Sequence, residues 1–372
     1  MIEPEPLQQL NRTYVRFRGR KLSYFSGCDY FRLASHPKVV AALAHAAHRY
    51  GLNVAASRMT SGNHRLYGKL EAKLTLFFEA PTALLVGSGY MTNLVVAQTL
   101  AGHFSHALID ERAHPSLQDA ARLLDCPVLP YKHQRAEDIA SCAFRCGPGA
   151  RLILLTDGLF AHDGSAAPLA QYLEVLPPDA VLLVDDAHGA GVLGSTGKGS
   201  LEHERVGRER VIQTITLSKA FGTYGGAILS SKSVRQRILD RSALFASSTP
   251  LPLPLVEASL ASLVLLSTDR GLRARLNRNS ELVKSRLRAT YPAMRATPGP
   301  IVRLVPPDKK EALRLHRKLI RAGIFPPYLS YPSRASTPYF RFAFSSEHTG
   351  SQLNKLLQTL TKAGLAGWEV IG

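Results

Sequence analysis

The chain has 372 residues, of which 45% are hydrophobic and 20% charged, which is typical of a globular protein with room for two domains. No uninterrupted apolar run reaches the ~18 residues of a membrane-spanning helix, and the opening Met1–Pro6 stretch lacks the apolar centre of a signal peptide. The four cysteines form no CxxC pair, so we expect a reducing, cytoplasmic compartment rather than a disulfide framework.

The net charge is +18 and the sequence pI is near 10.0. The basic residues are scattered, and neither a basic tail nor a zinc-finger, RRM or bZIP pattern accompanies them, so nucleic acid is not the expected partner. A phosphate-bearing small molecule or an acidic carrier protein would be attracted by the same positive field. A purely solubilising role for the charge fits equally well.

The N-terminal third begins with a predicted hairpin over 14–18 and 21–25, turning at Gly19-Arg20. A helix is predicted next, because Pro37 suits a first turn, an apolar stripe follows it and Gly51 ends it. A second helix is predicted from about Tyr67 to Phe78.

Short apolar runs then alternate with segments long enough for helices. Most of these runs are continuous rather than alternating, as expected for strands buried on both faces of a parallel sheet. The pattern predicts an α/β fold. The runs are Thr82–Val86, His106–Ile109, Leu152–Thr156, Ala180–Asp185, Val211–Leu217 and Gly226–Leu229.

The sequence pattern changes after about residue 235. Helices and a few short strands are predicted there, which indicates an α+β region. We therefore expect an N-terminal segment over 1–35, a large domain over 36–235 and a small C-terminal domain over 236–372, with the N-terminal segment packing on the small domain. The predicted helices are Arg235–Phe245, Leu255–Leu266, Glu281–Tyr291 and Gly350–Ala363, and the predicted strands are Ile301–Val305 and Tyr339–Phe344.

Polar motifs follow several of the strands in the large domain, where open α/β sheets place ligands. The turn Gly87–Tyr90 leads from a strand into a helix, so its N–H groups could cradle a phosphate, although a tight turn without a ligand has the same pattern. An apolar strand ends at Asp185, which a nearby cation would keep ionised. A loop-capping aspartate is one alternative. A metal site built with Asp186 and His188 is another, but no further ligand cluster supports it and we expect no metal.

Lys219 follows another buried run and precedes several glycines, which is a poor position for a solvated lysine. Desolvation lowers the pKa of such an amine and frees it for imine formation. The candidate phosphate turn comes first in the chain, then Asp185, then Lys219. Pyridoxal phosphate (PLP) requires these three groups: a phosphate site, a partner for its pyridine nitrogen and a lysine that forms an imine. His114 lies just beyond a strand and is placed to stack on the cofactor ring; alone, it would be interpreted as a capping or core histidine.

Two stretches carry a specific resemblance. Val184-Asp185-Asp186-Ala187-His188-Gly189 and Thr216-Leu217-Ser218-Lys219-Ala220-Phe221-Gly222 are similar to motifs of the α-oxoamine synthase family of PLP enzymes. The resemblance covers nearly the whole chain, and the 8-amino-7-oxononanoate synthases are the most similar members. It implies fold-type-I PLP-dependent transferase architecture, with a central, mostly parallel sheet and a smaller C-terminal α+β domain.

The resemblance also implies residue roles. Lys219 would be the imine lysine and base, Asp185 the partner of the pyridine nitrogen, His188 a neighbour of the ring hydroxyl and His114 the stacking group. Ser88, Gly89, Tyr90 and Thr216 would lie at the phosphate, joined by Ser248 or Thr249 of a neighbouring subunit, so a homodimer is implied. Arg341 would hold the amino-acid carboxylate near Cys28, although a buried strand arginine can also be purely structural.

The implied reaction condenses a small amino acid, alanine or glycine, with an acyl-CoA or acyl carrier protein thioester and releases CO2. Cys28, Ala161 and the pair Ala55-Ala56 depart from the family pattern and leave the substrates open. Another fold-type-I activity, an aminotransferase or an aldol or elimination lyase, remains the alternative. A nucleic-acid-binding protein that retains a PLP fold is a third hypothesis, against which the intact Asp185, His188 and Lys219 argue.

Overall fold

The computed structural model describes residues 5–330 and 337–372, and these form two compact units. The large unit comprises 36–160 and 166–269, and the small unit the described parts of 1–35, 161–165 and 270–372. The N-terminal segment therefore belongs with the small unit, as expected. The division that we predicted near residue 235 lies instead between Asp269 and Arg270.

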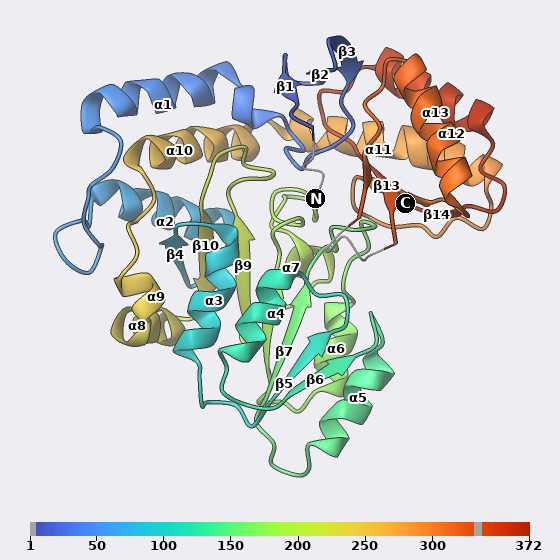
Figure 1. Cartoon of the computed structure of the whole chain (residues 1–372). Helices are drawn as coiled ribbons and strands as arrows, with labels where there is room; N and C mark the ends of the chain where they lie inside the picture. The colour runs from blue at the N-terminus through green and yellow to red at the C-terminus, as the bar shows by residue number, and fades with distance from the viewer. Residues whose placement is uncertain (1–4, 331–336) are drawn as a thin grey trace. The chain divides into compact units, whose positions relative to one another are not determined.

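A seven-stranded sheet forms the centre of the large unit (Figure 1), in the order β4-β10-β9-β8-β7-β5-β6. The pairs from β9 through β6 are parallel, whereas β10 is antiparallel to both β4 and β9. The sheet is thus mostly parallel, which confirms the predicted fold class. The strands are β4 Thr82–Val86, β5 His106–Asp110, β6 Val128–Tyr131, β7 Leu152–Asp157, β8 Val181–Asp185, β9 Val211–Thr216 and β10 Gly226–Ser230.

Helices cover both faces of this sheet, and each face has its own apolar core. Helices α3, α4, α8 and α9 contribute to one core and α5, α6 and α7 to the other. Helix α10 packs against α1 and α2, which keeps residues beyond 235 in the large unit. The helices are α1 Pro37–Tyr50, α2 Arg65–Phe78, α3 Gly89–Thr99, α4 Pro115–Arg122, α5 Ala136–Arg145, α6 Leu169–Val175, α7 Ser200–His203, α8 Lys232–Arg241, α9 Ala243–Ala246 and α10 Leu253–Thr268.

Local sequence signals explain where most of these elements begin and end. In α1 the His36 side chain accepts the Lys38 N–H, Pro37 occupies the first turn and Gly51 ends the helix at a φ of 70°. The helix predicted over Arg235–Phe245 is instead two helices, because the Ser242 side chain caps a new one by accepting the Phe245 N–H. Strand β6 was not predicted, since it is short, partly exposed and interrupted by Pro130.

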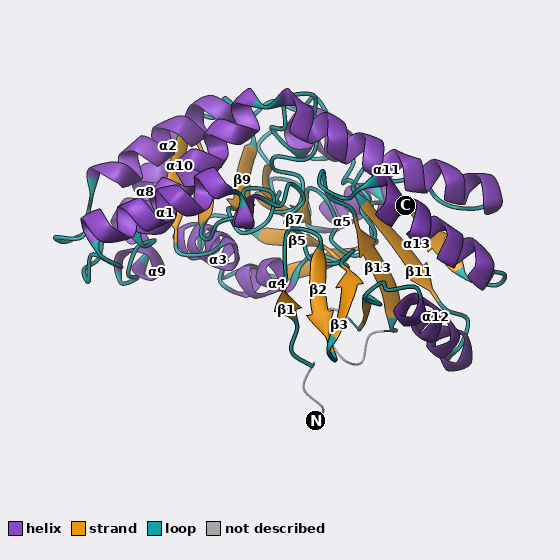
Figure 2. Cartoon of the chain, turned by 90° about the horizontal axis from the view of Figure 1, so that it is seen from above, coloured by secondary structure: helices purple, strands orange, loops and turns teal. Residues whose placement is uncertain are grey.

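The small unit contains a four-stranded antiparallel sheet in the order β12-β13-β11-β14 and a three-stranded N-terminal sheet, β1-β2-β3. Helices α11, α12 and α13 pack against the four-stranded sheet through one apolar core (Figure 2). The elements are β1 Gln8–Gln9, β2 Tyr14–Phe17, β3 Arg20–Ser23, η1 Leu33–Ser35, α11 Arg270–Thr290, β11 Ile301–Val305, α12 Lys309–Arg321, β12 Tyr328–Leu329, β13 Tyr339–Ala343, α13 Gly350–Ala363 and β14 Glu369–Ile371.

The N-terminal hairpin, β11, β13 and α13 confirm the sequence predictions for this unit. Helix α13 begins with a capping box in which Thr349 and Gln352 satisfy each other's backbone N–H groups. Helix α12 was not predicted, because its many basic residues hide the apolar stripe formed by Ala312, Leu315 and Leu319. Among the helices described, none combines the length and apolar character needed to cross a bilayer.

Candidate active site

A pocket of about 270 Å³ opens at one edge of the seven-stranded sheet. Strands β4, β5, β7, β8 and β9 all run in the same direction, so their carboxyl ends meet at this edge. The pocket is lined by residues that end or follow these five strands. They are Ser88, Gly89, Tyr90, His114, Ser116, Asp157, Asp185, Ala187, His188, Thr216, Ser218 and Lys219.

The turn after β4 forms one wall of the pocket and is built by close backbone packing. A Cβ added to Gly89 would lie 2.7 Å from the Thr216 Cβ, so no larger residue fits there without displacement. The Ser88 side chain accepts the Met91 N–H at 3.3 Å and thereby caps α3. The helix start leaves backbone N–H groups at the pocket, which is an arrangement suited to a phosphate.

Tyr90 ends this turn and Thr216 packs against it. The Thr216 hydroxyl lies 2.8 Å from the Ser218 hydroxyl and donates to the Gly225 carbonyl oxygen at 3.2 Å. Tyr90 is more exposed, and its hydroxyl donates to the Asp119 carboxylate. A second hydroxyl group therefore supports the Thr216 side chain at the pocket wall.

Asp185 is 6% exposed, and three donors hold its carboxylate in place. One oxygen accepts the Asn93 side-chain amide at 2.7 Å and the Ser116 hydroxyl at 3.4 Å, and the other accepts the Ala187 N–H at 3.0 Å. Asn93 is itself fully buried and accepts the Thr214 hydroxyl at 2.7 Å. This network fixes the orientation of the Asp185 carboxyl group, which lines the pocket.

Asn93, Ser116 and Thr214 were missed at the sequence level. The available signal was Asn93, a buried polar residue one helical turn beyond Gly89 that directly precedes the apolar run Leu94–Ala97. A polar residue of this kind finds hydrogen-bond partners where its helix faces a ligand site. Its contact with Asp185 joins residues 92 positions apart, which no local pattern shows.

His114 is half-buried and caps α4, where its Nδ1 atom accepts the Ser116 N–H at 3.2 Å and lies 2.8 Å from the Ser116 hydroxyl. Burial lowers the pKa of the imidazole; nearby Asp185 opposes this effect, and Lys219 adds to it. The imidazole is therefore neutral near pH 7 and offers an uncharged aromatic face. The Tyr90 ring lies 6.1 Å away, edge to face at 71°.

Asp186 follows Asp185 in sequence but does not line the pocket. It is fully buried, and one oxygen accepts the Ser200 N–H at 2.8 Å and the Gln213 side-chain amide at 2.7 Å. Burial raises its pKa to about 7. The alternative metal site of Asp185, Asp186 and His188 is therefore not formed, because these two carboxylates are directed differently.

Asp157 was not singled out by the sequence, yet it ends β7 and lines the pocket beside Asp185. One of its oxygens accepts the His114 N–H at 2.8 Å. Lys219 and His188 lie where the sequence predicted, at the pocket after β9 and β8. Lys219 is half-buried and His188 is 4% exposed.

Ser248 and Thr249 lie outside the pocket, in the chain that follows α9. The Ser248 hydroxyl donates to the Leu244 carbonyl oxygen, and Thr249 is exposed. Their predicted role concerns the pocket of a second subunit, so it stays a prediction.

Arg341 and Cys28 belong to the small unit. Arg341 lies on β13, is 8% exposed and donates from Nε to the Ala161 carbonyl oxygen. One of its terminal nitrogens lies 3.6 Å from the Cys28 sulfur. The structure thus brings together two residues that the sequence assigned to the substrate.

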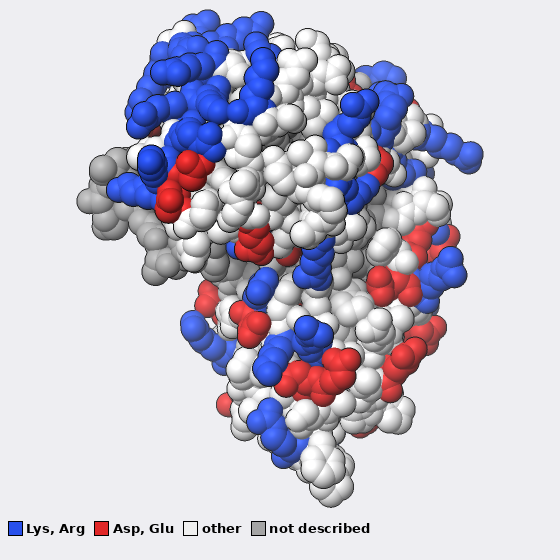
Figure 3. Space-filling view, turned by 90° about the vertical axis from the view of Figure 1, so that its right-hand side faces the viewer, with Lys and Arg blue, Asp and Glu red and all other residues white. Residues whose placement is uncertain are grey.

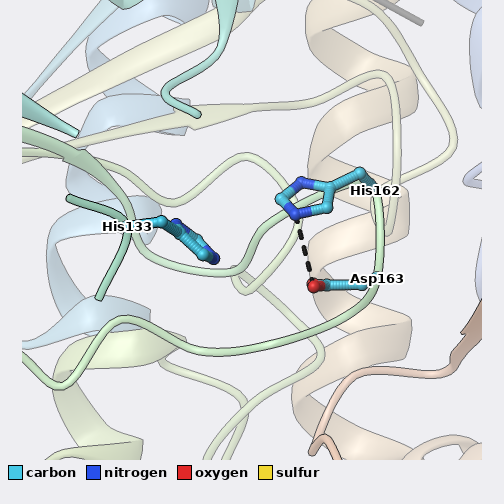
Figure 4. Close-up of side chains that lie close together, drawn as sticks. All are labelled: His133, His162 and Asp163. Carbon is cyan, nitrogen blue, oxygen red and sulfur yellow. Dashed lines mark ion pairs between the residues drawn. The ribbon is translucent and has the colours of Figure 1, made fainter. Parts of the chain in front are cut away.

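The loop beyond Ala161 is stabilised by local polar contacts. The His162 Nε2 atom lies 3.3 Å from an Asp163 carboxylate oxygen (Figure 4), and the other oxygen accepts the Ser165 N–H and hydroxyl at 2.9 and 2.7 Å. Burial opposes ionisation of Asp163, but the contact with His162 and the hydrogen bonds from Ser165 outweigh it and hold the pKa of the carboxyl below its ordinary value. This part of the motif is therefore structural.

Comparisons with known proteins place the chain in a family. The model for aminotransferase class I and II proteins matches residues 27–360. An 8-amino-7-oxononanoate synthase from Thioalkalivibrio sulfidiphilus is 36% identical and covers 95% of this chain and 91% of its own length. Another from Hahella chejuensis is 34% identical and covers 94% of this chain and 88% of its own length.

Solved structures agree with these relatives. The serine palmitoyltransferase of Sphingomonas wittichii has a TM-score of 0.89 at 26% identity, covering 96% of this chain and 91% of its own. The 8-amino-7-oxononanoate synthase of Francisella tularensis has a TM-score of 0.79 at 25% identity, covering 92% of this chain and 97% of its own. The expected fold-type-I architecture is confirmed by both.

Proposed function

The chain belongs to the aminotransferase class I and II family, in which it groups with the α-oxoamine synthases, and we propose that it condenses alanine or glycine with an acyl thioester. In the balanced reaction a carbon–carbon bond forms between the α-carbon and the acyl carbon. The amino acid's carboxyl group leaves as CO2, and the thioester sulfur leaves as a free thiol. The observation that most supports this proposal is that Gly89, Asp185 and Lys219 line one pocket.

Pyridoxal phosphate is the cofactor, and solved relatives hold it. The pocket fits this group on three counts. The helix start at Gly89 is a cradle that a Cβ would close, Asp185 is a buried acid directed to the open space, and Lys219 reaches the same space. Bound PLP supplies an electron-accepting ring that makes the α-proton of an attached amino acid acidic.

Each side chain has a role in this proposal. Lys219 carries the cofactor and removes the α-proton. Asp185 would pair with the ring nitrogen, and its three donors hold the carboxyl group in position for this. His114 presents its neutral ring to the cofactor face, and His188 lies near the ring hydroxyl. The phosphate is held by Ser88, Gly89, Tyr90 and Thr216.

Arg341 holds the amino-acid carboxylate in this proposal, with Cys28 beside it. A guanidinium presents two parallel N–H donors that match the two oxygens of a carboxylate. The nearly complete burial of Arg341 supports the assignment, because a buried cation is costly unless something uses its charge.

The product in the relatives' names carries its amino group on C8 beside a terminal methyl group, which supports alanine as the amino acid, and these names also support a role in biotin biosynthesis. The basic surface supports an anionic thioester donor, either acyl-CoA or an acyl carrier protein. Lys and Arg side chains gather at the top of the face in Figure 3. Helix α12 alone carries Lys309, Lys310, Arg314, Arg317, Lys318 and Arg321.

We also propose a cytoplasmic homodimer in which Ser248 or Thr249 reaches the partner's phosphate. The four free cysteines support a reducing compartment. Packed helices α1 and α10 expose apolar side chains, which supports burial against a second copy. These side chains are Val40 at 48%, Leu43 at 37% and Val264 at 55% exposure. Sedimentation of the purified protein over a range of concentrations tests the dimer.

The reaction is tested with purified protein, PLP, one amino acid and one acyl thioester. Thiol release and CO2 release in equal amounts, dependent on alanine or glycine, are the expected result. Acyl-CoA and acyl carrier protein substrates of several chain lengths identify the donor. Transfer of the amino group to a keto acid without thiol release would instead establish the alternative, an aminotransferase.

A further inference from the structure

Two carboxyl groups stand side by side at the pocket wall. Asp157 ends β7 and Asp185 ends β8, and the two residues are register partners in this parallel pair. Asp157 is 4% exposed and Asp185 is 6% exposed, yet both line the pocket. Two neighbouring acids in a site of low dielectric do not both ionise, so a proton resides on one of them.

Hydrogen bonding decides which acid carries that proton. Asp185 accepts three donors, from Asn93, Ser116 and Ala187. Asp157 accepts one, the His114 N–H at 2.8 Å on Oδ2. Its Oδ1 atom has no hydrogen-bond partner among residues 5–330 and 337–372, and it is not among the atoms sealed inside the protein. Asp157 therefore has fewer donors than its neighbour to stabilise an ionised form.

The electrostatic surroundings of Asp157 also favour its protonated form. Burial raises the pKa of Asp157 well above its ordinary value, and the neighbouring Asp185 and Asp110 act in the same direction. The His114 backbone N–H and Lys219 oppose the effect without reversing it. The titratable side chains of His114 and His188 line the same pocket as Asp157.

We infer that Asp157 is a neutral carboxylic acid in the working enzyme and donates a hydrogen bond from Oδ1 to an anionic oxygen of the ligand in the pocket. This inference rests on the proposed function, which supplies the ligand. A neutral donor stabilises negative charge on that oxygen without adding a second negative charge beside Asp185. Asp157 is thus a binding residue of the site that is distinct from the four predicted catalytic groups.

Two substitutions separate the hydrogen bond from the charge. Asp157→Asn keeps a neutral donor, whereas Asp157→Ala removes it. In the holoenzyme we expect kcat/KM to fall about tenfold further for the alanine variant than for the asparagine variant, as for loss of one hydrogen bond to a charged acceptor. A weaker affinity for PLP would place the acceptor on the cofactor, and a higher KM for the amino acid would place it on the substrate. Equal losses in the two variants would overturn the inference.

The protonation state can be measured without turnover. Infrared spectra of the PLP-loaded protein should contain a protonated-carboxyl band at neutral pH that disappears in Asp157→Asn. Asp186 is also buried with a raised pKa, so the Asp186→Asn spectrum identifies its separate band. Absence of a band from Asp157 would overturn the inference. A wild-type protein that binds PLP but releases no thiol would instead overturn the proposed reaction, so the two failures are distinguishable.

Asp110 offers a matched control. It ends the neighbouring strand β5, is fully buried and does not line the pocket. Its carboxylate already accepts the Arg112 N–H at 2.8 Å and lies 3.0 Å from the His133 ring. Asp110→Asn should lower the free energy of unfolding while leaving the Asp157 band in place. Loss of that band in the control would show that it does not report on Asp157.

Discussion

Buried ionisable side chains occur in both units of the protein, but their surroundings differ. In the small unit Lys284 is 2% exposed and donates to the carbonyl oxygens of Thr297, at 2.8 Å, and Gly299. In the large unit Asp185, Asp157 and Lys219 converge on an open pocket. A buried ionisable group that is enclosed by backbone oxygens stabilises a loop, whereas one that lines an open pocket indicates chemistry.

The same contrast separates two consecutive residues. Asp185 ends β8 and lines the pocket, whereas Asp186 is enclosed by Ser200 and Gln213. Side chains alternate in direction along an extended chain, so one step reverses the environment. If the contrast is correct, substitutions at the pocket should impair cofactor binding and turnover, and substitutions of enclosed groups should change stability.

The largest effect is expected at Lys219. Lys219→Ala should lower turnover about 10³-fold, since it removes the general base and the attachment point of the cofactor. Thiol release measures turnover, and the mass of the protein after borohydride reduction measures attachment. Lys232→Ala, an exposed lysine at the start of α8, is the control. Retention of a reducible cofactor bond in Lys219→Ala would contradict the assignment.

A smaller effect is expected at the phosphate turn. Gly89→Ala places a Cβ 2.7 Å from the Thr216 Cβ and should weaken PLP affinity roughly 10- to 100-fold, as overpacking costs ~1–3 kcal/mol. Equilibrium titration with PLP measures the affinity. Gly68→Ala is matched, because nothing lies within 4 Å of the added Cβ and alanine favours helix α2. Equal PLP affinity in both variants would exclude Gly89 from the cradle.

Arg341 tests whether the small unit contributes to substrate binding. Arg341→Lys should raise the KM for the amino acid about tenfold and change kcat less, because lysine cannot form the paired hydrogen bonds. Arg303→Lys is the control, since Arg303 is the register partner of Arg341 on β11. An unchanged KM in Arg341→Lys would leave Arg341 with a structural role only.

The smallest effect concerns the stability contributed by Asp186. Its folded pKa is raised from 3.8 to about 7, so its stabilisation is complete below about pH 4 and is lost as the pH rises to 7. Asp186→Asn keeps the acceptor for Ser200 and Gln213 but cannot ionise. The free energy of unfolding in urea should therefore fall less for this variant over that range, by about 1 kcal/mol or more. Parallel pH profiles of the two proteins would contradict this.

Sequence patterns predicted the helices and strands that have a clear local signal, such as a cap or a continuous apolar run. The caps of α1, the continuous apolar strands β7 and β8 and the helix α13 all agree with expectation. The elements that were missed, β6 and α12, are partly exposed or strongly charged, so their apolar pattern is weak. The boundary near 235 failed because the packing of α10 on α1 joins segments far apart in the chain.

The sequence by itself determined the types of residue in the pocket: a glycine turn, an acid, a lysine and a histidine, each at or shortly after the end of a buried strand. The sequence could predict these residues because a polar residue at the end of an apolar run is a local signal. Tertiary structure alone decided that Asp185 faces the pocket while Asp186 does not, that Asn93 supports Asp185, and that Asp157 stands beside it. Strand register and long-range hydrogen bonds set these relations, and neither is encoded in a short stretch of chain.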